Sequence, residues 1–224
     1  MGVLGTHLYF RLSAKMTEPL LITTGPNNTP HTEPNTRTSI RQTLRTKRKT
    51  LTTAFQIEAS ESLKLRLLNH PRVQSAKKIA LYLANDGELD PMSFINWCWQ
   101  QGKQVYLPVL HPFCPGHLLF LLFEKTSFMV KNQYGINEPK LDVTKVCPLE
   151  QLDVLCTPLV AFDCSGARLG MGGGFYDRTL VNWQKNQLYP IGIAHDCQQI
   201  AQVPVEYWDI PLPEIITPTQ NHQF

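Results

Sequence analysis

Between residues 78 and 196, short apolar runs rich in β-branched and aromatic residues alternate with segments of helical character. This alternation is typical of a largely parallel, buried sheet with helices on its faces. In such a sheet, ligands bind at the carboxyl ends of the strands. The expected strands cover residues 78–84, 104–110, 117–123, 153–163 and 188–196, and the expected helices cover 91–102 and 176–186.

The N-terminal part of the chain lacks this organisation. From Pro19 to Thr38 the sequence is rich in Thr, Pro and Asn and has almost no periodic apolar residues. Such a segment buries too little apolar surface to offset the conformational entropy that is lost on folding. A length of 224 residues suits one α/β domain with a tail. We therefore predict a disordered tail over residues 1–34 and a single domain over residues 35–224.

Two helices are expected at the start of this domain, ending before Pro71. The first carries six cations and no acid: Arg37, Arg41, Arg45, Lys47, Arg48 and Lys49. Arg37, Arg41 and Arg45 lie four residues apart and so share one helix face. A polyphosphate could use this face. The six cations together form either a solvated basic face or an arm that meets phosphate groups.

Composition excludes several classes of protein. Hydrophobic residues make up 42% and charged residues 17% of the chain, with a net charge of +3, which is too mild to indicate a nucleic-acid partner. Six cysteines without C-x-x-C spacing are typical of reduced cytosolic thiols and favour no structural metal. No run approaches the ~20 apolar residues that cross a bilayer. We expect a cytoplasmic monomer without nucleic-acid or membrane partners.

The stretch "RLGMGGGFYDRTL", residues 168–180, joins an expected strand to an expected helix. Glycines at the start of a helix expose backbone N–H groups, and the helix dipole favours an anion there. Arg168 and Arg178 can add charge-assisted hydrogen bonds to phosphate oxygens. The stretch matches neither the P-loop nor the dinucleotide-binding pattern. A flexible linker or a tight turn is the alternative, but the flanking charged and aromatic residues favour anion binding.

This stretch resembles the signature of the 5-formyltetrahydrofolate cyclo-ligase family, also called methenyltetrahydrofolate synthetases, and in particular its enterobacterial-type members. The likeness runs from about residue 38 to about residue 217 and includes, in order, "LYLANDGELD", "VYLPVLHPF", "GINEPKLD", "LDVLCTPLVAFD", "IGIAHDCQ" and "VPVEYWDIPLP". It implies a three-layer α/β fold with a Rossmann-like sheet, similar to the sugar-phosphate isomerase and CoA-transferase group.

The resemblance also implies an activity. The family uses ATP and magnesium to convert 5-formyltetrahydrofolate, with or without a polyglutamate tail, to 5,10-methenyltetrahydrofolate, releasing ADP and phosphate. The formyl oxygen is phosphorylated, and nitrogen 10 of the folate then closes the ring. This makes the expected protein a carbon–nitrogen ligase that forms a ring. Phosphoryl transfer depends mostly on positioning and on charge neutralisation.

Matching positions carry the family's roles. The resemblance implies ATP binding by Arg37, Arg41, Arg168, Leu169, Gly170, Met171, Gly172, Gly173, Gly174, Phe175 and Tyr176. It implies folate binding by Leu83, Glu88, Met171, Gly172, Gly173, Gly174 and Phe175. It implies catalytic roles for Arg168, Tyr176 and Arg178, and magnesium binding by Asp177 and Asp209. Val109-Leu110-His111 departs from the family's aromatic pattern, so no folate contact is assigned there.

Other interpretations remain open on the residues alone. Asp177 can be an ordinary acid of a first helical turn, Asp209 a turn residue, Glu88 a solvated loop acid and Tyr176 a core tyrosine. At the level of function, the alternatives are a non-catalytic folate or nucleotide binder, a nucleic-acid binder built on the basic helix, and a thiol enzyme that uses Cys164 or Cys156.

Overall fold

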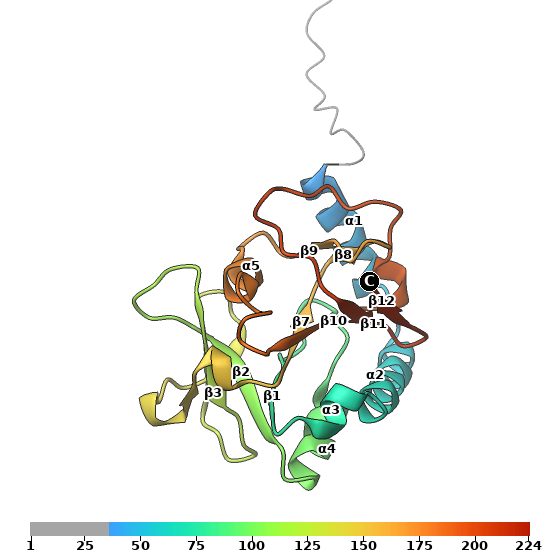
Figure 1. The fold of residues 1–224 in the computed structure, drawn as a ribbon. Coiled ribbons are helices and arrows are strands. Elements are labelled where there is room, and N and C mark those ends of the chain that lie inside the picture. Colours follow the sequence, from blue (N-terminus) through green and yellow to red (C-terminus); the bar gives the residue numbers. More distant parts are fainter. Residues whose placement is uncertain (1–35) are drawn as a thin grey trace, which may run out of the picture. The chain divides into compact units, whose positions relative to one another are not determined.

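The computed structural model describes residues 36–224, so the predicted disordered segment 1–34 lies outside the described residues. Its centre is an eight-stranded sheet with strand order β12-β11-β10-β7-β1-β2-β3-β6 (Figure 1). Strands β11, β10, β7, β1 and β2 run parallel, whereas β12, β3 and β6 pair antiparallel to their neighbours. The sheet strands are Lys78–Ala80 (β1), Gln104–Leu110 (β2), Leu118–Leu122 (β3), Val146–Cys147 (β6), Val154–Pro158 (β7), Tyr189–Ile193 (β10), Glu214–Ile216 (β11) and Asn221–Gln223 (β12).

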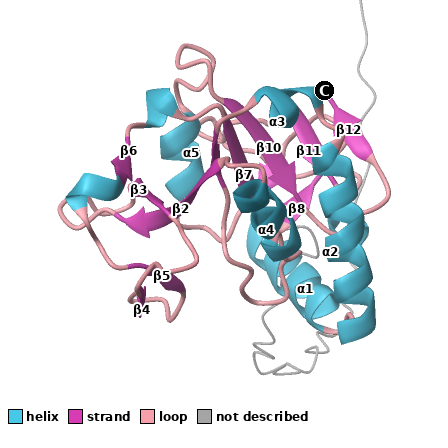
Figure 2. Ribbon diagram, turned by 90° about the horizontal axis from the view of Figure 1, so that it is seen from below, coloured by secondary structure: helices cyan, strands magenta, loops and turns pink. Residues whose placement is uncertain are grey.

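Helices cover both faces of this sheet (Figure 2). Leu63 of α2 and Phe94 of α4 are fully buried with Ile79 of β1 on one face, and Leu180 of α5 is buried with Ala80 on the other. Because successive residues of a strand point to opposite faces, one short strand contributes to both cores. The α-helices are Arg37–Lys49 (α1), Thr53–Leu68 (α2), Pro71–Ser75 (α3), Met92–Gln100 (α4) and Phe175–Leu180 (α5). The three-layer α/β arrangement with a mostly parallel sheet is therefore confirmed.

Helix α1 does not lie on the sheet faces. Its apolar residues Ile40 and Leu44 pack on Leu169 and Val160, in and beside a small hairpin that follows β7. This contact brings the row of arginines on α1 to the carboxyl ends of the strands. The small hairpins are Met129–Lys131 with Asn137–Pro139 (β4 and β5) and Ala161–Phe162 with Arg168–Leu169 (β8 and β9). The 3-10 turns are Val143–Lys145 (η1), Leu149–Gln151 (η2) and Asp196–Gln198 (η3).

Several elements are shorter than the sequence predicts. The expected strand 78–84 ends at Ala80, after which the chain turns over the end of the sheet with positive φ at Asp86 and Gly87. The expected helix 176–186 ends at Leu180. The expected strand 117–123 is present as β3, but it is antiparallel to β2 because a short connection joins them.

The described residues all fall within one compact unit. The wider prediction of a single domain over 35–224, with its boundary at the tail, remains a prediction. Among the described residues, no helix is long and apolar enough to cross a membrane.

Candidate functional site

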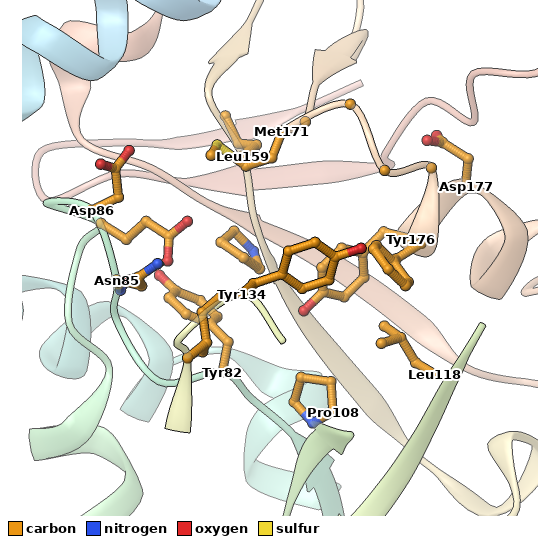
Figure 3. A pocket seen from close by; sticks show the side chains of 18 of the residues that line it. Tyr82, Asn85, Asp86, Pro108, Leu118, Tyr134, Leu159, Met171, Tyr176 and Asp177 are labelled. Carbon is orange, nitrogen blue, oxygen red and sulfur yellow. The ribbon is translucent and has the colours of Figure 1, made fainter. Parts of the chain in front are cut away.

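A cavity of about 780 Å³ opens at the carboxyl ends of β1, β2 and β7, where the parallel-sheet pattern places ligands (Figure 3). Its walls come from the turn after β1, the ends of β2 and β3, the β4–β5 hairpin, the loop after β9 and helix α1. In Figure 3, Asp86 and Asp177 lie on opposite sides of this cavity, with Tyr134 between them in the view. The cavity therefore has two distinct sides.

One side is formed by the loop 170–174, which we call the glycine loop. Gly172 has φ of +101° and Gly174 has φ of +65°, a conformation that favours glycine. Within the described part of the chain, the backbone N–H groups of this loop donate to no other residue. A Cβ on Gly170 would meet only Arg168, at 4.0 Å. The loop thus offers free donors and an open approach beside Gly170.

At positions 173 and 174, neighbouring side chains of the protein itself limit the space for a side chain. A Cβ at Gly173 would approach the ring of Phe175 to 2.6 Å, and one at Gly174 would approach the guanidinium of Arg178 to 2.9 Å. Packing against the Phe175 ring therefore restricts position 173 to a residue without a side chain, whereas at position 174 the positive φ is the stronger reason for glycine. The open approach to the backbone is clearest at Gly170.

Two arginines at the glycine loop have unused hydrogen-bonding capacity. Nε of Arg41 donates to the carbonyl of Gly170 at 2.8 Å, and Arg41 forms no ion pair with any carboxylate among residues 36–224. Burial and the neighbouring Arg37 lower the pKa of Arg41. Arg168 is 4% exposed and pairs with Asp177 at 2.8 Å, but its buried Nε has no partner among the described residues. Such donors favour an anionic ligand.

The two predicted metal-binding acids lie next to each other but are held differently. Oδ1 of Asp177 accepts from Arg168 and from the backbone N–H of Ile210, which leaves Oδ2 without a partner in the described part of the chain. Both oxygens of Asp209 accept from Arg37. Although burial opposes it, this pairing lowers the pKa of Asp209. Asp177 therefore has a free oxygen for a cation, and Asp209 serves Arg37.

The other side of the cavity is organised by the turn 85–88. Arg48 is fully buried and donates to the side chain and carbonyl of Asp86 and to the carbonyl of Leu159. Its guanidinium also lies 3.6 Å from Glu88. Although burial opposes it, hydrogen bonds from Arg45, Lys49 and Arg48 hold the pKa of Asp86 well below its ordinary value. Three cations at the C-terminal end of α1, Arg45, Arg48 and Lys49, thus fix the position of this turn.

Glu88 lies inside this turn with a side chain 12% exposed. Burial raises the pKa of Glu88 from 4.5 to about 7, and the charge of Arg48 opposes that rise only in part. One oxygen accepts from the backbone N–H of Asn85 at 3.1 Å. Glu88 is therefore a largely buried carboxyl group in the cavity lining that can accept hydrogen bonds from a ligand.

Tyrosines surround Glu88. The hydroxyl of Tyr82 donates to the carbonyl of Leu89 at 2.6 Å, whereas the hydroxyl of Tyr176 has no partner among the described residues. Burial raises the pKa of both tyrosines, so each carries its proton at neutral pH. Tyr134 reaches the cavity from the β4–β5 hairpin, and its ring packs edge-on against Phe175 at 6.2 Å. These rings give this side the surface that a flat heterocycle requires.

Most of the residues predicted to bind ligands line this one cavity. They are Arg37, Arg41, Leu83, Glu88, Arg168, Gly170, Met171, Gly172, Gly173, Gly174, Phe175, Tyr176, Asp177 and Asp209. Leu169 is fully buried against α1, and Arg178 is not part of the cavity lining but donates to the backbone carbonyls of Gly116 and Gly173. Their predicted roles in ATP binding and catalysis gain no support from this geometry and remain predictions.

Several other lining residues are not among those predicted from the sequence. Tyr134 and Glu138 enter from the β4–β5 hairpin, Trp208 from the loop before Asp209, and Pro108 from within β2. The segment "GINEPKLD" belongs to the family likeness and includes Glu138, so it held a usable signal. Tyr134 lies outside the segments of the family likeness, and only the folded hairpin brings its side chain to the cavity.

With free donors beside a glycine loop and a carboxyl group among aromatic rings, this α/β protein has a site that can bring a phosphate-bearing ligand to a second small molecule. The family model of the 5-formyltetrahydrofolate cyclo-ligase family matches residues 33–218. The chain belongs to this family, as its sequence resemblance indicates.

Individual relatives agree with this assignment. The chain is 53% identical over 177 residues to the 5-formyltetrahydrofolate cyclo-ligase of Escherichia coli, a match that covers 79% of this chain and 97% of the relative. It is 51% identical over 180 residues to the enzyme of the same name from Haemophilus influenzae, covering 80% and 96%. The NMR structure of Aquifex aeolicus 5,10-methenyltetrahydrofolate synthetase superposes with a TM-score of 0.72 at 26% identity, over 84% of this chain and 92% of that chain.

Proposed function

We propose that this chain catalyses the ATP-dependent conversion of 5-formyltetrahydrofolate to 5,10-methenyltetrahydrofolate, with release of ADP and phosphate. One observation carries the proposal beyond family membership. A single cavity holds Arg41, a cation with no carboxylate partner among residues 36–224, at the glycine loop, and Glu88 on the opposite side. Both substrates of such a reaction can therefore meet in one space.

The chemistry requires a formamide oxygen to become a leaving group. In the proposed sequence the formyl oxygen attacks the γ-phosphorus of ATP, the bond to the bridging oxygen breaks, and ADP leaves. Nitrogen 10 then attacks the formyl carbon and loses its proton, and the carbon–oxygen bond breaks to release phosphate. Arg41 and Arg168 stabilise the charge that develops on the transferring group, and the glycine loop donates backbone hydrogen bonds to it.

Magnesium fits the residues present at one position. The free Oδ2 of Asp177 lies beside the glycine loop, and Mg²⁺ prefers one or two carboxylates together with phosphate oxygens and water. When bound, the ion would neutralise charge between the terminal phosphates. No group of three or more His, Cys, Asp or Glu side chains in the described part of the chain could hold a metal without a ligand. A role for Asp209 as second ligand remains a prediction, since Arg37 occupies both of its oxygens.

The folate occupies the aromatic side in this proposal. Glu88 accepts hydrogen bonds from the ring and amino N–H groups of the pterin, and the free hydroxyl of Tyr176 lies within the same wall. Burial keeps the Tyr176 proton in place, so this side chain donates to the substrate and does not act as a base near neutral pH. Rings on several sides exclude water from the reacting carbon.

Three further statements belong to the same proposal. The enzyme acts as a monomer. It works in the cytoplasm, which is supported by six cysteines that form no disulfide. It accepts folates with or without a polyglutamate tail.

The test is the absorbance of the methenyl product. Purified protein should generate this chromophore from 5-formyltetrahydrofolate only when ATP and magnesium are both present, with one phosphate released for each product molecule. Reactions that omit one component at a time are the controls. Binding of both ligands without phosphate release would instead identify a non-catalytic binding protein and refute the proposal.

A further inference from the structure

The side chain of Arg178 lies outside the cavity lining, yet it contacts the glycine loop. Its Nε donates to the carbonyl of Gly116 at 2.7 Å, and its Nη2 donates to the carbonyl of Gly173. Gly116 belongs to the connection between β2 and β3, 62 residues earlier in the chain. One guanidinium therefore joins two loops that are distant in sequence.

Both loops are shaped to receive this guanidinium. Gly116 has φ of +82°, and a Cβ there would lie 2.8 Å from the guanidinium carbon of Arg178. A Cβ at Gly174 would lie 3.3 Å from the same carbon. The guanidinium also lies 5.8 Å from the centre of the Phe175 ring, which packs against Gly173. The position of Arg178 is thus restricted on three sides.

This contact has a consequence for the opposite side of the loop. In a trans peptide the C=O and the N–H point in opposite directions. Because the carbonyl of Gly173 is directed to Arg178, the N–H of Gly174 is directed away from it. Gly174 lines the cavity, whereas Arg178 does not, so the side of the loop opposite Arg178 is the one that can face the cavity.

We propose that Arg178 is a positioning residue: anchored on Gly116, its guanidinium holds the Gly173–Gly174 peptide so that the Gly174 N–H faces the phosphates of ATP. The proposal rests on the proposed function, since it takes the glycine loop as the ATP site. It assigns to Arg178 no contact with substrate. Without the anchor this peptide can rotate, because glycine tolerates both orientations.

Two different changes should disturb the anchor in the same way. Arg178→Ala removes the guanidinium, and Gly116→Ala displaces it through the added Cβ. Each should weaken binding of β,γ-imido-ATP, measured by calorimetry, about tenfold, which corresponds to about 1.4 kcal/mol for one lost charge-assisted hydrogen bond. The Kd for 5-formyltetrahydrofolate should change less than twofold. Arg178→Lys should restore part of the nucleotide affinity.

Matched controls separate this effect from loss of stability. Gly102 has φ of +68° and no atom within 4 Å of a Cβ, so Gly102→Ala carries the backbone strain without the collision. Arg66→Ala removes another guanidinium that donates to backbone carbonyls, at Pro218 and Thr219, away from the cavity lining. Neither variant should change the affinity for nucleotide.

The double variant Gly116→Ala with Arg178→Ala gives the decisive comparison. Once the guanidinium is absent, the alanine at 116 has nothing to displace, so the double variant should bind nucleotide as the Arg178→Ala variant does. Additive losses, or a Gly116→Ala variant with wild-type affinity, would overturn the positioning role and leave direct contact with phosphate as the function of Arg178. Failure of the wild-type protein to bind nucleotide would instead refute the proposed function.

Discussion

The buried carboxyl of Glu88 makes stability depend on pH in a way that one substitution can isolate. Burial raises its pKa from 4.5 to about 7 in the folded protein. A carboxyl whose pKa is raised on folding contributes stability that is fully present below its unfolded pKa and is lost as pH rises through its folded pKa. Because one pKa unit corresponds to about 1.36 kcal/mol, the contribution lost between about pH 4 and about pH 8 is about 3 kcal/mol.

Glu88→Gln removes this titration while keeping the shape of the side chain. The free energy of unfolding, measured by urea denaturation across this pH range, should fall more steeply for the wild-type protein than for the variant. The difference between the two curves should grow by about 3 kcal/mol in favour of the variant from low to high pH. Glu150→Gln, at an exposed glutamate, is the matched control and should follow the wild-type curve.

The same titration affects the proposed substrate. Only the ionised carboxylate accepts hydrogen bonds with both oxygens, so the KM of the wild-type enzyme for 5-formyltetrahydrofolate should fall as pH rises through about 7. The KM of the Glu88→Gln variant should be higher and should lack this dependence. Stability curves that stay parallel across the range would show that Glu88 is not held in its neutral form by burial, and the reasoning would fail.

Two further predictions follow from buried arginines. Asp177→Ala should abolish magnesium-dependent turnover. It should also lower the free energy of unfolding by about 3 kcal/mol, because the buried Arg168 loses its carboxylate partner. Asp177→Asn should abolish turnover but keep most of the stability. An Asp177→Ala variant that unfolds at the wild-type urea concentration would contradict the predicted loss of stability. A wild-type rate in either variant would contradict the predicted role in turnover. Arg48→Met should cost about 3 kcal/mol in the same assay, since it leaves the turn at Asp86 without its buried partner, with Lys47→Met as the exposed control. Equal stability of these two variants would argue against the role given to Arg48.

The sequence pattern predicts the sheet and its helices because apolar periodicity reports which face of each element is buried. The same pattern is a weaker guide to the residue at which a helix or strand ends. The run 78–84 continues to be apolar after Ala80 because Leu81 and Tyr82 are buried by tertiary contacts outside the ladder. The strand β11 lies in "PEIITP", too short for the pattern to stand out, and its buried Glu214 pairs with His70.

Most of the candidate site could be predicted from one local signature together with the family likeness. The interactions within the site could not, because they join residues far apart in sequence. Arg48 is one of the six cations of α1, for which the sequence alone allows a solvated basic face, yet the fold buries it completely against the turn at Asp86. Likewise Arg178 stands within the signature itself, but only the structure shows that its guanidinium reaches Gly116.

The order in which the ribosome delivers these residues sets a limit on when the enzyme can become competent. Helix α1 is synthesised first among the described elements, but its Arg37 meets Asp209, 172 residues later. Arg41 likewise contacts Gly170, which is synthesised 129 residues later. The nucleotide side of the cavity therefore stays open in a nascent chain until Asp209 has been synthesised, because these contacts join residues far apart in sequence.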